Sequence, residues 1–175
     1  MTVPVIRPVK PSDAAAIAAI YRAAVLADTA TFETDPPNES EMAARMAAIT
    51  AAGHPFLVGE VDEVIAGYAY ASTFRPRAAF ALTLEDSVYV APHAQRQGLG
   101  RLLLASLIEA ASAGGFHQMV AVIGDSQTKA ASIALHAAAG FRTMGSLEAV
   151  GRKHDQWLDI VFMQRGLGEQ RLSPS

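Results

Sequence analysis

A short glycine turn at residues 95–101, with the sequence Q-R-Q-G-L-G-R, has the residue types and spacing that suit phosphate binding. It falls between an expected strand and an expected helix, so the first backbone N–H groups of the helix point into one loop. Gly98 and Gly100 let the backbone approach a ligand closely, and Arg96 and Arg101 add positive charge at the positive end of the helix dipole. The turn therefore predicts a pyrophosphate site, although a glycine-softened helix start without a ligand has the same pattern.

Two familiar nucleotide-binding motifs do not fit this turn. A Walker A loop requires G-x-x-x-x-G-K-[ST], and neither the second glycine nor the lysine follows Gly98 at that spacing. A dinucleotide fingerprint requires a third glycine at the position of Leu103 and a preceding βαβ unit at the N-terminus. Binding of a nucleoside triphosphate or of NAD is therefore not expected.

Outside the turn, a carboxylate, a histidine and two arginines have side chains that suit proton transfer or anion binding. Glu85 lies in an apolar or neutral stretch where partial burial would raise its pKa, but its position alone also fits an exposed carboxylate at a strand end. His136 has the chemistry of a proton donor or of an ordinary helix histidine with one hydrogen bond. Arg75 and Arg77 flank Pro76, and their guanidinium groups suit a carboxylate or phosphinyl oxygen as well as bulk solvent.

Composition excludes several other kinds of site. The chain has no cysteine, and no two of its five histidines have the spacing of a metal-ligand pair, so no disulfide and no metal are expected. A net charge of −3 and a pI of about 5.9 argue against nucleic acid or an anionic membrane as a partner. No apolar run approaches the roughly 18 residues of a membrane span, and the N-terminus lacks the apolar block of a signal peptide. We expect a soluble, cytoplasmic protein.

Alternating strands and helices are expected to position these residues within a single domain at 1–165, followed by a loose tail at 166–175. Strands are expected at 3–9, 56–60, 64–72, 81–90, 119–123, 141–150 and 157–164. Helices are expected at 12–27, 38–53, 100–113 and 130–139, the first of them capped by Ser12. This order predicts an α/β fold with a mixed, mostly antiparallel sheet of about seven strands and about four helices.

The turn and its surroundings resemble the GNAT superfamily of acetyl-coenzyme A dependent N-acetyltransferases. Gln95-x-x-Gly98-x-Gly100 is similar to the [QR]-x-x-G-x-[GA] signature with which these enzymes hold the pyrophosphate of acetyl-CoA. The block at 131–141 is similar to the helix and strand that flank the pantetheine and the thiol. Together with the blocks at 29–33, 83–90 and 157–164, it resembles the phosphinothricin and methionine sulfoximine or sulfone acetyltransferases over roughly residues 5–165.

The resemblance implies acetyl-CoA as the co-substrate, without a metal. In this family the strand before the turn splays from its neighbour, and its free backbone groups pair with the pantetheine arm as an added strand would. Cofactor contacts are thus expected from Val88, Tyr89, Val90, Gln95, Arg96, Gln97, Gly98, Leu99, Gly100, Arg101, Lys129 and Ser132. Lys129 stands where the family usually has asparagine, so its contact with the cofactor is left open.

The resemblance also implies roles at the acetyl group. Glu85 corresponds to the general base, and His136 occupies the position from which many relatives protonate the leaving thiolate with a tyrosine. Substrate contacts are expected from Phe32, Arg75, Pro76, Arg77, Glu85, Asp86 and Ser87. Arg77 is the favoured arginine, because its separation from Glu85 matches the resembling enzymes. Glu85 and Asp86 are adjacent on a strand and should point to opposite faces, so they are not expected to act as a pair.

The expected reaction is acetyl transfer to the amino group of a small amino acid with a phosphinyl, sulfone or sulfoximine group, by direct attack in a ternary complex. One alternative is acetylation of another small amine or of a peptide N-terminus. The other is a non-catalytic acyl-CoA sensing module, which would need the glycine turn but neither Glu85 nor His136. A homodimer is expected from the resemblance alone. The polar segment 152–156 departs from the family and indicates a different substrate preference.

Overall fold

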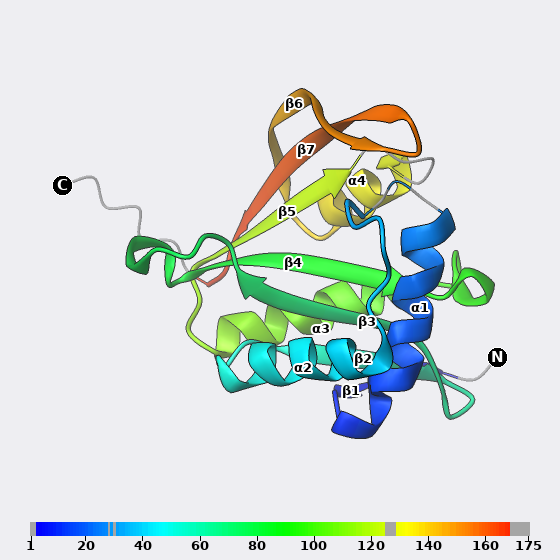
Figure 1. The fold of residues 1–175 in the computed structure, drawn as a ribbon. Coiled ribbons are helices and arrows are strands. Elements are labelled where there is room, and N and C mark those ends of the chain that lie inside the picture. Colours follow the sequence, from blue (N-terminus) through cyan, green and yellow to red (C-terminus); the bar gives the residue numbers. More distant parts are fainter. Residues whose placement is uncertain (1–2, 28, 30, 125–128, 169–175) are drawn as a thin grey trace.

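A computed structural model describes residues 3–27, 29, 31–124 and 129–168 of the chain. These residues form one mixed sheet of seven strands in the order β1-β2-β3-β4-β5-β7-β6, with four α-helices packed against it (Figure 1). The strands are β1 (Val5–Pro8), β2 (Phe56–Val61), β3 (Val64–Thr73), β4 (Thr83–Val90), β5 (Gln118–Gly124), β6 (Arg142–Lys153) and β7 (Gln156–Gly166). The helices are α1 (Ala14–Ala27), α2 (Glu39–Ala51), α3 (Leu99–Ala113) and α4 (Lys129–Ala138). The predicted α/β class and mostly antiparallel sheet are confirmed.

Some predicted boundaries were wrong in informative ways. Strand β7 runs through Gly166, and Leu167 is buried in the core, so the fold continues past the predicted end at 165. Strand β6 reaches Lys153 because its polar end pairs with the start of β7, from Arg152↔Trp157 to Lys153↔Gln156. The sequence at 169–175, predicted as a loose tail, lies outside the described residues.

The start of α1 is fixed by a charge network and not by Ser12, so the predicted cap was wrong. The carboxylate of Asp13 accepts a hydrogen bond of 2.7 Å from the Lys10 N–H and binds Arg7 at 2.8 Å. Arg7 also binds Glu60 of β2. The hydrogen bond from Arg7 holds the pKa of Asp13 below its usual value although burial opposes this. These ion pairs join β1, β2 and the beginning of α1.

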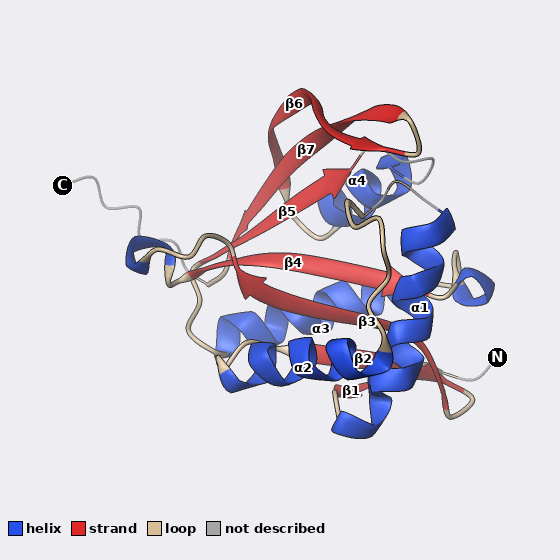
Figure 2. Ribbon diagram, in the orientation of Figure 1, coloured by secondary structure: helices blue, strands red, loops and turns tan. Residues whose placement is uncertain are grey.

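The helices form a layer on each side of the sheet (Figure 2). Helices α1 and α2 pack on one face with Phe56, Val58 and Tyr68, and α3 and α4 pack on the other with Ala69, Leu84 and their neighbours. Because successive residues of a strand point to opposite faces, the two faces of β4 belong to two different cores. The candidate site residues of β4 are therefore also divided between the two faces of the sheet.

Helix α3 is pressed closely onto β2 and β3, which sets the place of the glycine turn before it. Leu99, Leu103, Leu104 and Leu107 of this helix are almost completely buried. A Cβ atom at Gly67 would lie 2.9 Å from the Tyr89 carbonyl oxygen and 3.1 Å from a Leu103 methyl carbon, so only glycine allows this approach. The N-terminus of α3 is thereby held beside β4.

Strands β4 and β5 form the only parallel pair of the described sheet, and they separate. Their pairing runs from Thr83↔Gln118 to Asp86↔Ala121. Beyond Asp86, β4 remains paired with β3, and β5 remains paired with β7. The opening between them is visible in Figure 1. The predicted splayed strand pair is confirmed.

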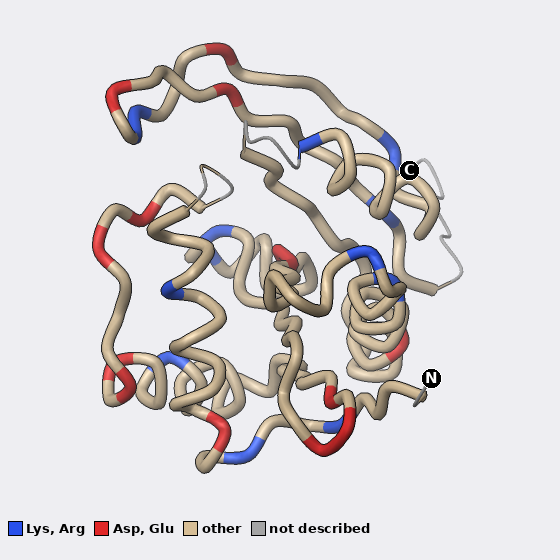
Figure 3. The backbone as a smooth tube through the Cα atoms, turned by 90° about the vertical axis from the view of Figure 1, so that its right-hand side faces the viewer, with Lys and Arg blue, Asp and Glu red and all other residues tan. Residues whose placement is uncertain are grey.

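Acidic and basic residues are interspersed along the described backbone, in keeping with the small net charge (Figure 3). None of the helices in the described residues has both the length and the apolar composition needed to cross a bilayer.

Candidate active site

The turn before α3 has the backbone geometry of an anion cradle. Gly98 is the N-cap residue of α3 and has a left-handed conformation with φ of 87°, and Arg96 also has a positive φ of 62°. The first N–H groups of a helix have no partner within it, so those of α3 are available to a ligand beside this turn. The first turn of α3 contains no acidic residue, which keeps the positive end of the helix dipole unopposed.

Two glutamine side chains brace the loop that carries the cradle. Gln95 donates from Nε2 to the Val90 carbonyl oxygen at 3.3 Å, and Gln97 donates to the His93 carbonyl oxygen at 3.0 Å. The first bond joins the turn to the end of β4. The cradle is therefore held in a fixed relation to the splayed strand.

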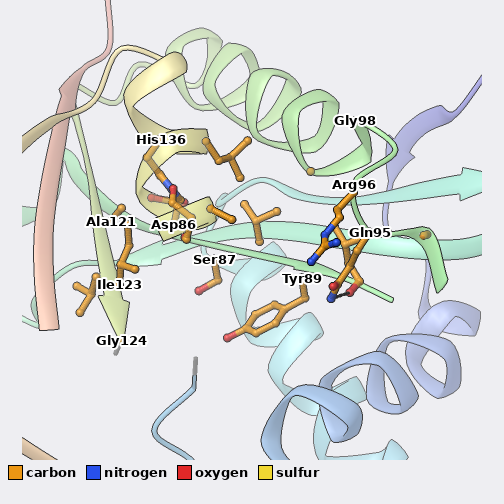
Figure 4. Close-up of a pocket in the computed structure, with 18 residues that line it drawn as sticks. Asp86, Ser87, Tyr89, Gln95, Arg96, Gly98, Ala121, Ile123, Gly124 and His136 are labelled. Carbon is orange, nitrogen blue, oxygen red and sulfur yellow. Dashed lines mark hydrogen bonds and ion pairs between the residues drawn. The ribbon is translucent and has the colours of Figure 1, made fainter. Parts of the chain in front are cut away.

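A cavity of about 470 Å³ extends from this turn along β4 and between β4 and β5 (Figure 4). The predicted cofactor residues that line it are Val88, Tyr89, Val90, Gln95, Arg96, Gly98, Gly100 and Ser132. Ala131 and Leu135, from the block predicted to flank the pantetheine, also line it, but sequence reasoning missed the wall formed by Ala94 and the end of β5 at 121–124. The sequence could have indicated the wall at the end of β5, because ligands of parallel sheets bind beyond the carboxyl ends of the strands.

Four predicted cofactor residues do not line the cavity. Leu99 is 1% exposed, and its side chain packs in the core. The Gln97 side chain is bound to the loop itself. Arg101 is exposed on α3, and Lys129 is half-buried at the start of α4. Their predicted contacts with the cofactor remain predictions.

Asp86 and His136 form a buried pair in the wall of the cavity. Asp86 Oδ2 lies 2.9 Å from His136 Nε2, and the two side chains are 1% and 6% exposed. Nδ1 of His136 lies 2.8 Å from the Ser132 carbonyl oxygen. Since a carbonyl only accepts, Nδ1 donates, and the Nε2–Oδ2 bond holds a second proton. Asp86 Oδ1 has no hydrogen-bond partner within the described residues.

The electrostatics of this pair favour a protonated histidine. Burial by itself lowers the pKa of His136, but the hydrogen bond and charge of Asp86, with the Ser132 carbonyl, raise it above the ordinary 6.5. Both ring nitrogens are already hydrogen-bonded. If His136 is the predicted acid, the bond between Nε2 and Asp86 must open for the proton to leave.

Glu85 lies on the other face of β4, as strand alternation required. It pairs with Ser72 of β3 on the side covered by α1 and α2, whereas Asp86 points to His136. Burial raises the pKa of Glu85, the charge of Asp86 raises it further, and Arg75 lowers it. Ser87, two residues along the same face as Glu85, lines the cavity, and Figure 4 shows it pointing away from His136. The cavity therefore opens toward the face of Glu85.

The predicted arginines lie in the exposed loop after β3. The Arg75 guanidinium carbon lies 5.3 Å from the centroid of the Phe74 ring, and its charge acts on Glu85. The Arg77 N–H donates to the Arg75 carbonyl oxygen at 2.8 Å, where the short helix Ala78–Phe80 begins, and Pro76 lies between them. The charge of Arg75 therefore acts on Glu85 in the structure, whereas the sequence favoured Arg77 as the arginine that contacts the substrate.

Phe32 belongs to the segment between α1 and α2, and the residue is 42% exposed. Two carbons of its ring lie 3.0 Å from the position that a Cβ atom would take at Gly151 of β6. Next to it, the Thr31 carbonyl oxygen accepts a hydrogen bond of 2.9 Å from the buried Lys153. The segment before α2 is therefore fastened to the end of β6.

The fold and the cavity define a class: an α/β domain that opens its sheet at a parallel strand pair and places a helix N-terminus there for a phosphorylated cofactor. The profile of the acetyltransferase (GNAT) domain matches residues 6–162. The chain belongs to this family of acetyltransferases. Within the described residues, no cluster of three or more potential metal ligands was found.

Curated relatives and a solved structure are similar over nearly the whole chain. A phosphinothricin N-acetyltransferase of Alcaligenes faecalis is 49% identical over 93% of this chain and 82% of its own. An L-methionine sulfoximine/L-methionine sulfone acetyltransferase of Salmonella typhimurium is 41% identical over 90% and 91%. A crystal structure of a phosphinothricin acetyltransferase from Sinorhizobium meliloti with AcCoA has a TM-score of 0.93 and 44% identity, and the match covers 99% of this chain and 93% of that one.

Proposed function

We propose that this protein transfers an acetyl group from acetyl-CoA to the amino group of a small amino acid of the phosphinothricin, methionine sulfoximine or methionine sulfone type. The relatives named above act on such compounds. One observation carries the proposal. The half-buried Glu85, whose pKa is raised, lies on one face of β4, and a cavity beside a helix N-terminus opens between β4 and β5.

The residues present suit acetyl-CoA. The N–H groups at the start of α3 would hold the pyrophosphate, and Arg96 would add a positive charge beside it. Within the described residues, β4 has no strand partner beyond Asp86 on the side of β5, so this backbone edge would pair with the pantetheine arm. Acetyl-CoA, when bound, supplies the thioester that is attacked.

Glu85 would make the acceptor reactive. An amino acid carries its amino group as an ammonium ion near neutral pH, and this form cannot attack a carbonyl carbon. The raised pKa of Glu85 suits it to take that proton, directly or through a water molecule. Arg75 and Arg77 would bind the α-carboxylate, and Phe32 and Ser87 would contact the rest of the acceptor.

The Asp86–His136 pair would return a proton to the departing sulfur. As the new C–N bond forms and the C–S bond breaks, negative charge collects on the sulfur, which needs a proton. His136 holds two protons when it is charged, and Asp86 favours that form. Transfer from Nε2 requires the imidazole to leave Asp86, and a water molecule that entered the site would be a competing donor.

We further propose a homodimer in the cytoplasm. Strand β6 is an edge of the sheet, and exposed apolar side chains gather on it and on the start of β7: Met144, Leu147, Val150 and Trp157. A second copy would cover this apolar surface. Light scattering should then show a dimer for the native protein and a monomer for Leu147→Glu.

The proposed location in the cytoplasm follows from the need for acetyl-CoA, which the cytoplasm supplies.

A thiol-release assay tests the proposed activity. Acetyl-CoA is offered with phosphinothricin, methionine sulfone, methionine sulfoximine, other small amines and a peptide N-terminus, and calorimetry measures acetyl-CoA binding in parallel. The proposal expects free CoA with the amino-acid analogues. Tight acetyl-CoA binding without thiol release from any amine would instead support a sensing module.

A further inference from the structure

A second cavity, of about 290 Å³, lies under α2 on the face of the sheet that carries Glu85. Its floor is aromatic: the ring of Phe56 stacks with that of Tyr70 at 5.1 Å between centroids and with that of Tyr68 at 5.8 Å. Met42 and Ile49 of α2 form an apolar wall. Ligand pockets are typically about 300–1,000 Å³, and a volume at the low end of this range suits a small group such as an amino-acid side chain.

This cavity adjoins the proposed base. Ser72 lines it and is the cross-strand partner of Glu85, and Tyr70 lines it and is the partner of Ser87. Directly paired residues have Cβ atoms about 4.5–5.5 Å apart on the same face of a sheet. The charge of Glu85 also contributes to the raised pKa of Tyr70, after the larger effect of burial. An acceptor whose amino group is at Glu85 would therefore have this cavity within reach of its side chain.

Among the described residues that line the cavity, no cation is free to bind an anion. Arg45 lines its rim but binds the Glu33 carboxylate with two hydrogen bonds, at 2.6 and 3.1 Å. Tyr21, which also lines the cavity, donates to Glu33 at 2.9 Å. The charge of Arg45 is thus matched by Glu33, and Glu85 adds negative charge nearby. An anionic group placed here would lose water without gaining a counter-charge.

We propose that this cavity receives the side chain of the acceptor amino acid and selects an uncharged side chain with an apolar end. Methionine sulfone, methionine sulfoximine and methionine satisfy this requirement, whereas phosphinothricin brings an anionic phosphinate. The assignment rests on the proposed function and names its preferred substrates. It also differs from what the 49% identity to a phosphinothricin N-acetyltransferase would suggest.

A series of acceptors tests the assignment in the native protein. At saturating acetyl-CoA, kcat/KM should rise about fourfold for each methylene added between L-alanine and L-norvaline, which is the ratio that burial of one methylene provides. L-methionine sulfone should exceed phosphinothricin by at least about tenfold, because the cavity cannot neutralise a phosphinate. A flat series, or a preference for phosphinothricin, would overturn the assignment.

A substitution at the exposed rim tests the location. Ala48 lines the cavity on the exposed side of α2, and Ala47 is an equally exposed neighbour outside the lining. Ala48→Phe should lower the norvaline-to-alanine ratio of kcat/KM at least about fivefold, and Ala47→Phe should leave this ratio unchanged. Equal ratios in both variants would place the side-chain site elsewhere. If the native protein releases no thiol with any amino acid, the proposed function fails and the assignment fails with it.

Discussion

Asp86 and His136 are held together across the junction of β4 and α4, with 2.9 Å between Oδ2 and Nε2 and almost no solvent exposure. Because 50 positions separate the two residues in the sequence, only the fold brings them into contact. It gives His136 a defined orientation and a preference for the charged form. The consequences can be measured without any substrate.

Asp86→Asn should lower the pKa of His136. The amide keeps a hydrogen-bonding group at the same place but removes the negative charge, so burial, which is the largest influence and opposes protonation, prevails. Titration of the imidazole by NMR should give a pKa above 6.5 in the native protein and below it in the variant. Asp155→Asn, at an exposed position, is the control. An unchanged pKa in Asp86→Asn would show that the pair does not control His136.

The same pair should make stability depend on pH. The pKa of His136 is raised in the folded protein, so its contribution to the free energy of unfolding is fully present below 6.5 and is lost as pH rises through the folded value. Asp86→Asn should therefore lower Tm more at pH 6 than at pH 9. Thermal unfolding followed by circular dichroism at both pH values measures this. Equal losses would point to packing alone.

Glu85→Gln should stabilise the protein at neutral pH. Burial raises the pKa of Glu85 above 4.5, so the unfolded chain gives up this proton at a lower pH than the folded one, and the carboxylate lowers stability as pH rises through that interval. A neutral amide removes this cost. Tm at pH 8 should increase for Glu85→Gln but not for Glu109→Gln, which is exposed on α3. A decrease in Tm would mean that Glu85 has a structural partner.

Two alanine substitutions in the glycine turn should differ in their effect on the affinity for acetyl-CoA. Gly98 has φ of 87°, where an L-residue costs about 1–2 kcal/mol, so Gly98→Ala should destabilise the turn and weaken acetyl-CoA binding at least about tenfold. At Gly100, a Cβ atom would meet Val90 and Leu135 at 3.6 and 3.7 Å, which is ordinary contact. Gly100→Ala should keep the affinity within about threefold. Calorimetry measures the acetyl-CoA affinity of both variants, and equal losses of affinity would contradict the role given to Gly98.

Gly151→Ala should act on the acceptor through Phe32. The added methyl group would lie 3.0 Å from two ring carbons, so the ring must move. If Phe32 contacts the acceptor, KM for the acceptor rises while the Kd of acetyl-CoA stays the same. Phe32→Leu should reproduce the effect without the steric conflict. No change in KM in either variant would limit Phe32 to packing against β6.

The sequence predicted the elements well because their signals are local. The apolar spacing of 100–113 and the glycines at 98 and 114 mark α3 within one residue of its observed start at Leu99. The cap of α1 was missed because Asp13 acts through Arg7 of another element. The end of β6 at 151–153 was also missed, because this polar strand end is stabilised by pairing with β7 and has no apolar pattern of its own.

Site residues that belong to one continuous sequence motif could be predicted. Site contacts between residues of different helices and strands could not. The sequence predicted a cofactor site at the turn 95–101 and at strand residues 88–90, and Gln95, Gly98 and all three strand residues line the cavity. The Asp86–His136 contact could not be predicted, and neither could the cavity that Tyr70 and Ser72 share with α2. Alternation along β4 did predict that Glu85 and Asp86 would point to different faces.

In the proposed reaction, Glu85 removes the proton of an amine that meets the cofactor at β4. The most direct measurement is the pH dependence of kcat/KM for L-methionine sulfone, followed by thiol release, in the native protein and in Glu85→Gln. The native rate should rise with pH through the raised pKa of Glu85. In Glu85→Gln the rate should be lower by at least about 100-fold and should not show this rise, while the acetyl-CoA affinity is preserved. A variant with native turnover and the same pH profile would contradict the claim.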